Sequence, residues 1–161
     1  MSRLENLSPA QRFMYEYGAF AAFWSNLEIL LEVAIWDLSG NDAKLNCRGI
    51  NPKTAGPKKQ ILEKLLIEKG MVDAQSALTE VFNVAERNDW LHGHIFNPKG
   101  DFSVLTRLRV SIVNKELSVS NTQINFEISP FQAFYTAFSR LQESLKLSEA
   151  RCNEYINLIQ A

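Results

Sequence analysis

The side chains best suited to chemistry lie close together in residues 86–94. This segment contains Arg87, Asn88, His92 and His94. An imidazole gives and takes protons near neutral pH, and a guanidinium holds a phosphate through two parallel hydrogen bonds. The combination suits cleavage of RNA, in which the 2′-hydroxyl attacks the adjacent phosphate. The protein then supplies an acid or base and a cation, without a metal ion.

These side chains continue the apolar stripe of a predicted helix over residues 73–92. The stripe recurs at helical spacing at Leu78, Val81, Phe82 and Ala85. Asn88 and His92 are four residues apart on the same face, so we expect the histidine to point inward toward a core or a partner. Arg87 lies on the flank of the helix and converges with the imidazole most easily at a cleft between helices or at a two-fold axis. Gly93 then ends the helix.

The run from Arg87 to His92 resembles the signature of the HEPN superfamily (higher eukaryotes and prokaryotes nucleotide-binding domains), which is Arg, a polar residue, three residues and His. The resemblance covers roughly the first hundred residues. It implies a small helical bundle, usually a homodimer, and a metal-independent endoribonuclease of toxin-antitoxin, phage-defence or RNA-processing systems. It also implies that Arg87 and His92 are catalytic, that Asn88 supports the histidine, and that no cofactor is needed. The implied partners are an RNA substrate and a neutralising antitoxin-like protein.

Other interpretations of the motif stay open. A histidine on an apolar stripe is commonly a core residue, and Arg87 could pair with Glu80 or Glu86. A HEPN-like module could instead bind a nucleotide, RNA or a protein through Arg87 and His92 without catalysis, and the chain could also be a dimeric helical scaffold. A metal site at His92 and His94 is weakly supported, because a helix-ending glycine separates them and no carboxylate set lies nearby. We therefore expect no metal.

Glu28 and His94 are the candidates for supporting roles beside the motif. Glu28 lies beside an aromatic-rich stripe, one turn after Trp24, in a predicted helix over residues 9–38. A partly buried carboxylate needs a positive or hydrogen-bonding partner, so Glu28 could orient Arg87 or His92 across a helix interface. A carboxylate on the flank of the helix, in water, explains the residue equally well.

The pattern predicts a mainly α chain in a single domain, with about four helices and a small antiparallel β insertion before the last helix. The resemblance implies that these helices form a HEPN-like bundle. The helices are expected at residues 9–38, 57–69, 73–92 and 130–160. The first and last begin with the same signature, a serine cap followed by a proline, at Ser8 and Ser129. Residues 39–56 are polar and are predicted to be irregular.

The β insertion is expected at residues 102–128, as a hairpin region of two or three strands. Apolar residues alternate with polar ones there, which is typical of a strand with one buried face. Asn114–Lys115 and Ser120–Asn121 are interpreted as tight turns.

Five cations form the best candidate for an RNA-binding surface: Lys44, Arg48, Lys53, Lys58 and Lys59. Only Asp42 opposes them in this part of the chain. A few closely spaced cations can engage a phosphate backbone even on a protein that is nearly neutral overall. A solvated loop is the plainer explanation, and for an isolated run of charges it is the favoured one.

The bulk properties of the chain limit the classes of function. With 161 residues and a net charge of −1, it can bury a core without disulfides, but it does not coat nucleic acid electrostatically. Cys47 and Cys152 match no metal spacing and are interpreted as thiols in a reducing compartment. We find no secretory signal and no charge-free stretch of membrane length. We therefore expect a cytoplasmic protein with no membrane partner.

Overall fold

The computed structural model describes residues 6–85, 94–96, 104–113, 116–125 and 131–161. Six helices and three strands lie within these residues, and helix predominates, which confirms the predicted mainly α class. The chain divides into two compact units, each described by itself: Met1–Ala22 with Ala85–Ala133, and Phe23–Val84 with Phe134–Ala161. The expectation of a single domain stays a prediction.

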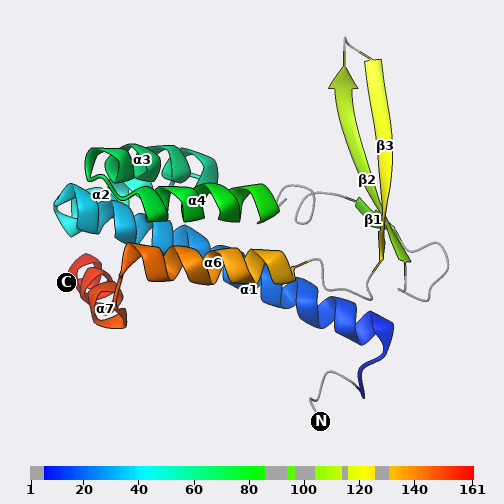
Figure 1. Cartoon of the computed structure of the whole chain (residues 1–161), viewed down its shortest axis with the longest axis horizontal. Coiled ribbons are helices and arrows are strands. Elements are labelled where there is room, and N and C mark those ends of the chain that lie inside the picture. Colours follow the sequence, from blue (N-terminus) through cyan, green and yellow to red (C-terminus); the bar gives the residue numbers. More distant parts are fainter. Residues whose placement is uncertain (1–5, 86–93, 97–103, 114–115, 126–130) are drawn as a thin grey trace. The chain divides into compact units, whose positions relative to one another are not determined.

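The longest element is α1 (Pro9–Ser39), which contributes to both units (Figure 1). It begins as the sequence indicated, because the Gln11 backbone N–H donates to Ser8 Oγ at 3.3 Å and the Ser8 N–H donates to Gln11 Oε1 at 2.9 Å. It ends at Gly40, whose φ of 67° is the left-handed conformation that closes a helix. All seven residues from Leu30 to Trp36 are buried, so this part of α1 is covered on every side.

Length and composition alone would let α1 cross a membrane, although half of its most apolar window is buried inside the structure. A buried core helix meets the same criteria. The expectation of a cytoplasmic protein stays a prediction.

In the second unit, aromatic side chains join α1 to α4 (Val72–Ala85) and α6 (Gln132–Leu145), three helices that are labelled in Figure 1. The ring of Trp24 stacks on Phe134 at 6.1 Å between centroids and meets Phe82 edge-on at 5.8 Å. Phe23 contacts Phe138 at 5.7 Å. We call these five residues the aromatic core.

The expectation that residues 39–56 are irregular is wrong, because they contain α2 (Ala43–Ile50). Asp42 is its N-cap, and its Oδ1 accepts the Leu45 backbone N–H at 3.0 Å. Aspartate is common both in turns and at N-caps, so a polar segment that contains Asp42 is compatible with an irregular stretch and with a helix start. The next helix, α3 (Ala55–Glu68), was expected and ends before Gly70.

The expected single helix at residues 130–160 is also wrong, because α6 ends at Leu145 and a separate helix, α7 (Glu149–Gln160), follows. Lys146 between them has a φ of 54°, and Ser148 caps α7 by accepting the Arg151 N–H at 3.2 Å. The apolar residues keep the same helical phase across the break, so periodicity could not reveal it. With α2, this raises the number of helices in the described residues from the expected four to six.

In the first unit, β1 (His94–Phe96), β2 (Val104–Val113) and β3 (Glu116–Asn125) form an antiparallel sheet in that order. The expected turn at Ser120–Asn121 is wrong, because both residues lie inside β3, paired with Arg109 and Leu108. Polar residues of this kind are also tolerated on an edge strand, and β3 is one. The expected turn at residues 114–115 lies outside the described residues.

Candidate functional site

The three predicted catalytic residues, Arg87, Asn88 and His92, lie outside the described residues, so their roles stay predictions. The part of the predicted helix beyond Ala85, the last residue of α4, also lies outside the described residues. His94 begins β1, where its backbone pairs in register with Leu108. The described helix that leads to the motif is therefore α4.

Two of the predicted site residues, Glu28 and Lys59, lie near Phe82 on α4. The Lys59 ammonium nitrogen, from α3, lies 5.5 Å from the centroid of the Phe82 ring. Trp24, which meets the same ring, donates its indole Nε1–H to Glu28 Oε1 at 3.0 Å. We call Trp24, Glu28, Lys59 and Phe82 the Phe82 cluster.

The Phe82 cluster supplies one carboxylate and one ammonium group, both half-buried, about one helical turn before the end of α4. Glu28 is thus not a carboxylate free in water: it has a hydrogen-bonding partner, as its partial burial requires. That described partner is an indole. Lys59 is stabilised by the face of the Phe82 ring through a cation–π contact.

The structure brings together only two of the five predicted RNA-binding cations. Lys44 and Arg48 are exposed on α2, one turn apart, and line a groove of about 320 Å³ that α2 shares with the end of α7. Lys53 is exposed in the turn that follows α2. Lys59 belongs to the Phe82 cluster.

Lys58 does not belong to any such surface, because it is buried with 3% of its area exposed. Its ammonium nitrogen lies 3.4 Å from Glu32 Oε2. The same carboxylate accepts the Tyr155 hydroxyl on Oε1 at 2.6 Å and the Asn51 side-chain amide on Oε2 at 3.2 Å. A buried lysine paired in this way is not available to contact RNA, which corrects the expectation for this residue.

Asn46 completes this arrangement, and we call Glu32, Asn46, Asn51, Lys58 and Tyr155 the Glu32 cluster. Asn46 Nδ2 donates to the Glu32 backbone oxygen at 3.3 Å and to the Tyr155 hydroxyl at 3.2 Å. Burial, followed by the hydrogen bond to Glu32, raises the pKa of Tyr155 well above its ordinary value, so its hydroxyl stays protonated and donates. The cluster joins α1, α2, α3 and α7 in the second unit.

The Glu32 cluster was missed in the sequence, although one signal for it is present. Glu32 lies within the run Ile29–Trp36, in which all the remaining residues are apolar. A helix that is apolar all round is buried all round, so a carboxylate in its middle requires buried partners. Nothing in the sequence pointed to Asn46 or Tyr155 as those partners, because they are 14 and 123 residues away from Glu32.

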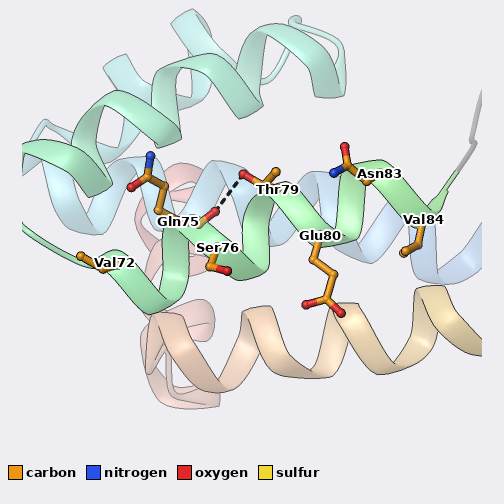
Figure 2. Close-up of a pocket in the computed structure, with 7 residues that line it drawn as sticks. All are labelled: Val72, Gln75, Ser76, Thr79, Glu80, Asn83 and Val84. Carbon is orange, nitrogen blue, oxygen red and sulfur yellow. Dashed lines mark hydrogen bonds between the residues drawn. The ribbon is translucent and has the colours of Figure 1, made fainter.

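A shallow groove of about 630 Å³ follows the surface of α4, and Figure 2 shows the side chains that line it. Thr79 turns back on its own helix and donates its hydroxyl to the Gln75 backbone oxygen at 3.1 Å. Glu80 points toward α6, where Arg140 donates to its carboxylate at 2.6 Å. Among the described residues that line this groove, Glu80 alone carries a charge, and a carboxylate does not favour a phosphate.

Both cysteines are free and half-buried. They pack against a small core that includes Val33, Trp36 and Tyr155. Burial, with a smaller contribution from Glu149, raises the pKa of the Cys152 thiol. A thiol in this environment is a poor nucleophile.

Within the part of the chain that the structure describes, no group of three or more His, Cys, Asp or Glu side chains is placed to hold a metal ion. Comparisons of the chain with models of protein families, with curated proteins and with solved structures find no match.

Proposed function

We propose that this chain is a metal-independent endoribonuclease of the HEPN type. The observation that carries the proposal is the motif from Arg87 to His92, which begins two residues after the end of α4. Its residue types match the reaction: Arg87 holds the scissile phosphate, His92 transfers a proton, and Asn88 supports the histidine. A homodimer, which the resemblance implies, would supply a second copy of the motif.

The reaction follows from the chemistry of RNA. A base removes the proton of the 2′-hydroxyl, whose oxygen forms a bond to the adjacent phosphorus. The bond from phosphorus to the 5′-oxygen breaks, and that oxygen takes a proton from an acid. The products carry a 2′,3′-cyclic phosphate and a 5′-hydroxyl. In a homodimer, His92 of one copy serves as the base and His92 of the other as the acid, while Arg87 stabilises the developing negative charge.

Two described features of the second unit support this proposal. The helix that leads into the motif is held against α1 and α3 by the Phe82 cluster, so its end is supported by packing on two sides. A site built on a packed helix holds its groups more precisely than a site on a loop. On another part of the second unit, Lys44 and Arg48 are exposed, one turn apart, and can contact a phosphate backbone.

The test compares purified wild-type protein with His92→Ala and Arg87→Ala on a single-stranded RNA, in the presence of EDTA. We expect wild-type cleavage to survive the chelator and to leave 2′,3′-cyclic phosphate ends. Each substitution should lower the rate by roughly 100-fold or more, the usual contribution of a general acid, base or charge-stabilising group. Cys47→Ala, which changes a half-buried residue elsewhere, is the matched control and should keep full activity.

Two results would contradict the proposed mechanism: cleavage that requires a metal ion, or His92→Ala protein that cleaves at the wild-type rate. If the reaction is as proposed, induced expression should also arrest growth, and the arrest should disappear with His92→Ala. A neutralising antitoxin-like protein and a cytoplasmic location belong to the same proposal, because an unopposed ribonuclease is toxic.

The alternative is a non-catalytic HEPN-like module that binds a nucleotide, RNA or a protein. It is favoured by one observation, the hydrogen bond from Trp24 to Glu28, because an indole already occupies one oxygen of this carboxylate. The binding module predicts that RNA of the same sequence binds to the protein and stays intact, and that Arg87→Ala weakens this binding.

A further inference from the structure

A second groove, of about 440 Å³, lies between α1, α2 and α3 in the second unit and is not used by the proposed function. Its walls are mainly apolar, with five aliphatic side chains from three helices: Ile35, Leu45, Ile50, Ile61 and Leu65. None of the described residues that line it carries a charge. Its size falls within the range of small-molecule sites.

One polar residue of this lining has an unused hydrogen-bond acceptor. Asn46 is 3% exposed, and its Oδ1 has no hydrogen-bond partner among the described residues. The orientation of the amide is determined by its neighbours, because the Glu32 backbone oxygen can only accept and therefore faces Nδ2. Both N–H groups of Asn46 are thus engaged, one by Glu32 and one by Tyr155, and the carbonyl oxygen remains.

An unpaired acceptor in a buried position is costly and calls for an explanation. A donor from outside the chain would remove that cost. Because Oδ1 is enclosed, such a donor has to displace side chains of the groove to reach it. Leu45 is 66% exposed although it is apolar, so a ligand that covers it removes apolar surface from water.

We propose that this groove binds a small, neutral, apolar molecule that carries one N–H or O–H donor, which Asn46 Oδ1 accepts. The apolar walls exclude a charged ligand, since they offer no partner for its charge. The Glu32 cluster holds Asn46 in place, so the acceptor is fixed before the ligand arrives.

The experiment uses the full chain and two probes, indole and N-methylindole, in which a methyl group replaces the N–H donor of the first. Binding is followed by titration with backbone amide NMR. We expect indole to bind saturably, with the largest shifts in residues 43–50, and roughly five- to tenfold more tightly than N-methylindole, the difference one hydrogen bond makes. Equal affinities, or no saturable binding of either probe, would overturn the proposal.

A pair of substitutions locates the site. Gly49 lines the groove, and a Cβ added there meets nothing within 4 Å, so the side chain of Gly49→Leu starts in open space. Gly56, on α3, also has nothing within 4 Å of an added Cβ but does not line the groove, so Gly56→Leu is the matched control. We expect Gly49→Leu to weaken indole binding by about tenfold or more and Gly56→Leu to leave it unchanged. Unchanged binding in both variants would place the probe elsewhere and refute the assignment.

Discussion

Two clusters in the second unit hold other helices to the same helix, α1, by different kinds of interaction. The aromatic core joins α1 to α4 and α6 through ring contacts between 5.7 and 6.1 Å. The Glu32 cluster joins the later part of α1 to α2, α3 and α7 through hydrogen bonds and one buried ion pair. Ring contacts depend mainly on buried area, whereas each hydrogen bond depends on the position of both partners.

The difference predicts how each cluster responds to a change. In the aromatic core, a smaller apolar side chain loses some area and contacts, and its neighbours partly adjust. In the Glu32 cluster, Lys58 and Tyr155 both depend on the carboxylate of Glu32, so removing it leaves each of them buried without its acceptor. Substitutions that remove one partner or both can therefore test whether the polar cluster acts as a unit.

The largest effect is expected for Glu32→Ala. This change leaves the Lys58 ammonium buried and unpaired, and removing one partner of a buried ion pair costs about 3–5 kcal/mol of unfolding free energy. Urea unfolding followed by circular dichroism measures the loss. Glu68→Ala, at an exposed position of α3, is the control and should lie within about 0.5 kcal/mol of wild type.

The double variant Glu32→Leu/Lys58→Met sharpens this prediction. With neither charge left in the interior, it should be more stable than Glu32→Leu alone by at least about 1 kcal/mol. If the effects of the two substitutions on the unfolding free energy are additive, the ion pair does not couple Glu32 to Lys58.

A smaller loss, of about 1 kcal/mol, is expected for Phe134→Leu in the aromatic core. Phe134 is buried to 1% exposure and stacks on Trp24, but leucine keeps much of the apolar area and needs no partner. The same urea measurement tests it, with Phe134→Ser as the comparison that removes the apolar side chain. A loss for Phe134→Leu as large as that for Glu32→Ala would mean that the two clusters do not differ in tolerance.

The two clusters also differ in how far the sequence predicts them. The aromatic stripe of α1 was visible because Phe20, Trp24, Leu27 and Leu31 recur at helical spacing, and all four are buried. Periodicity gives the buried face of a helix, but it does not give the partners of a buried polar group. Lys58 shows the consequence. From its charge it was predicted to be one of the exposed cations, whereas in the structure it is buried and paired with Glu32.

Local signals with two meanings limited the rest of the prediction. Asp42 and Ser148 each cap a helix, but in the sequence they were interpreted as a break and as part of a continuous helix. The Arg87–His92 motif was found because its residue types and spacing carry information without any tertiary contact. The groove beside Asn46 could not be found in this way, because it exists only where three helices meet.

The last effect expected is a pH dependence that belongs to the Glu32 cluster alone and develops only above pH ~10. Burial and the hydrogen bond to Glu32 raise the pKa of Tyr155 in the folded protein above the value of about 10 expected in the unfolded chain. Since the folded state favours the protonated hydroxyl, this contribution to stability is complete below pH ~10 and is lost as the pH rises further, by on the order of 1 kcal/mol per pH unit.

Urea unfolding at a series of pH values, for wild type and Tyr155→Phe, isolates this contribution, because every other titrating group is common to both proteins. The difference in unfolding free energy between the two should shrink as the pH rises above ~10. A difference that stays constant would show that the Tyr155 hydroxyl is no harder to ionise in the folded protein than in the unfolded chain, and the polar cluster would then resemble the aromatic core in its insensitivity to pH.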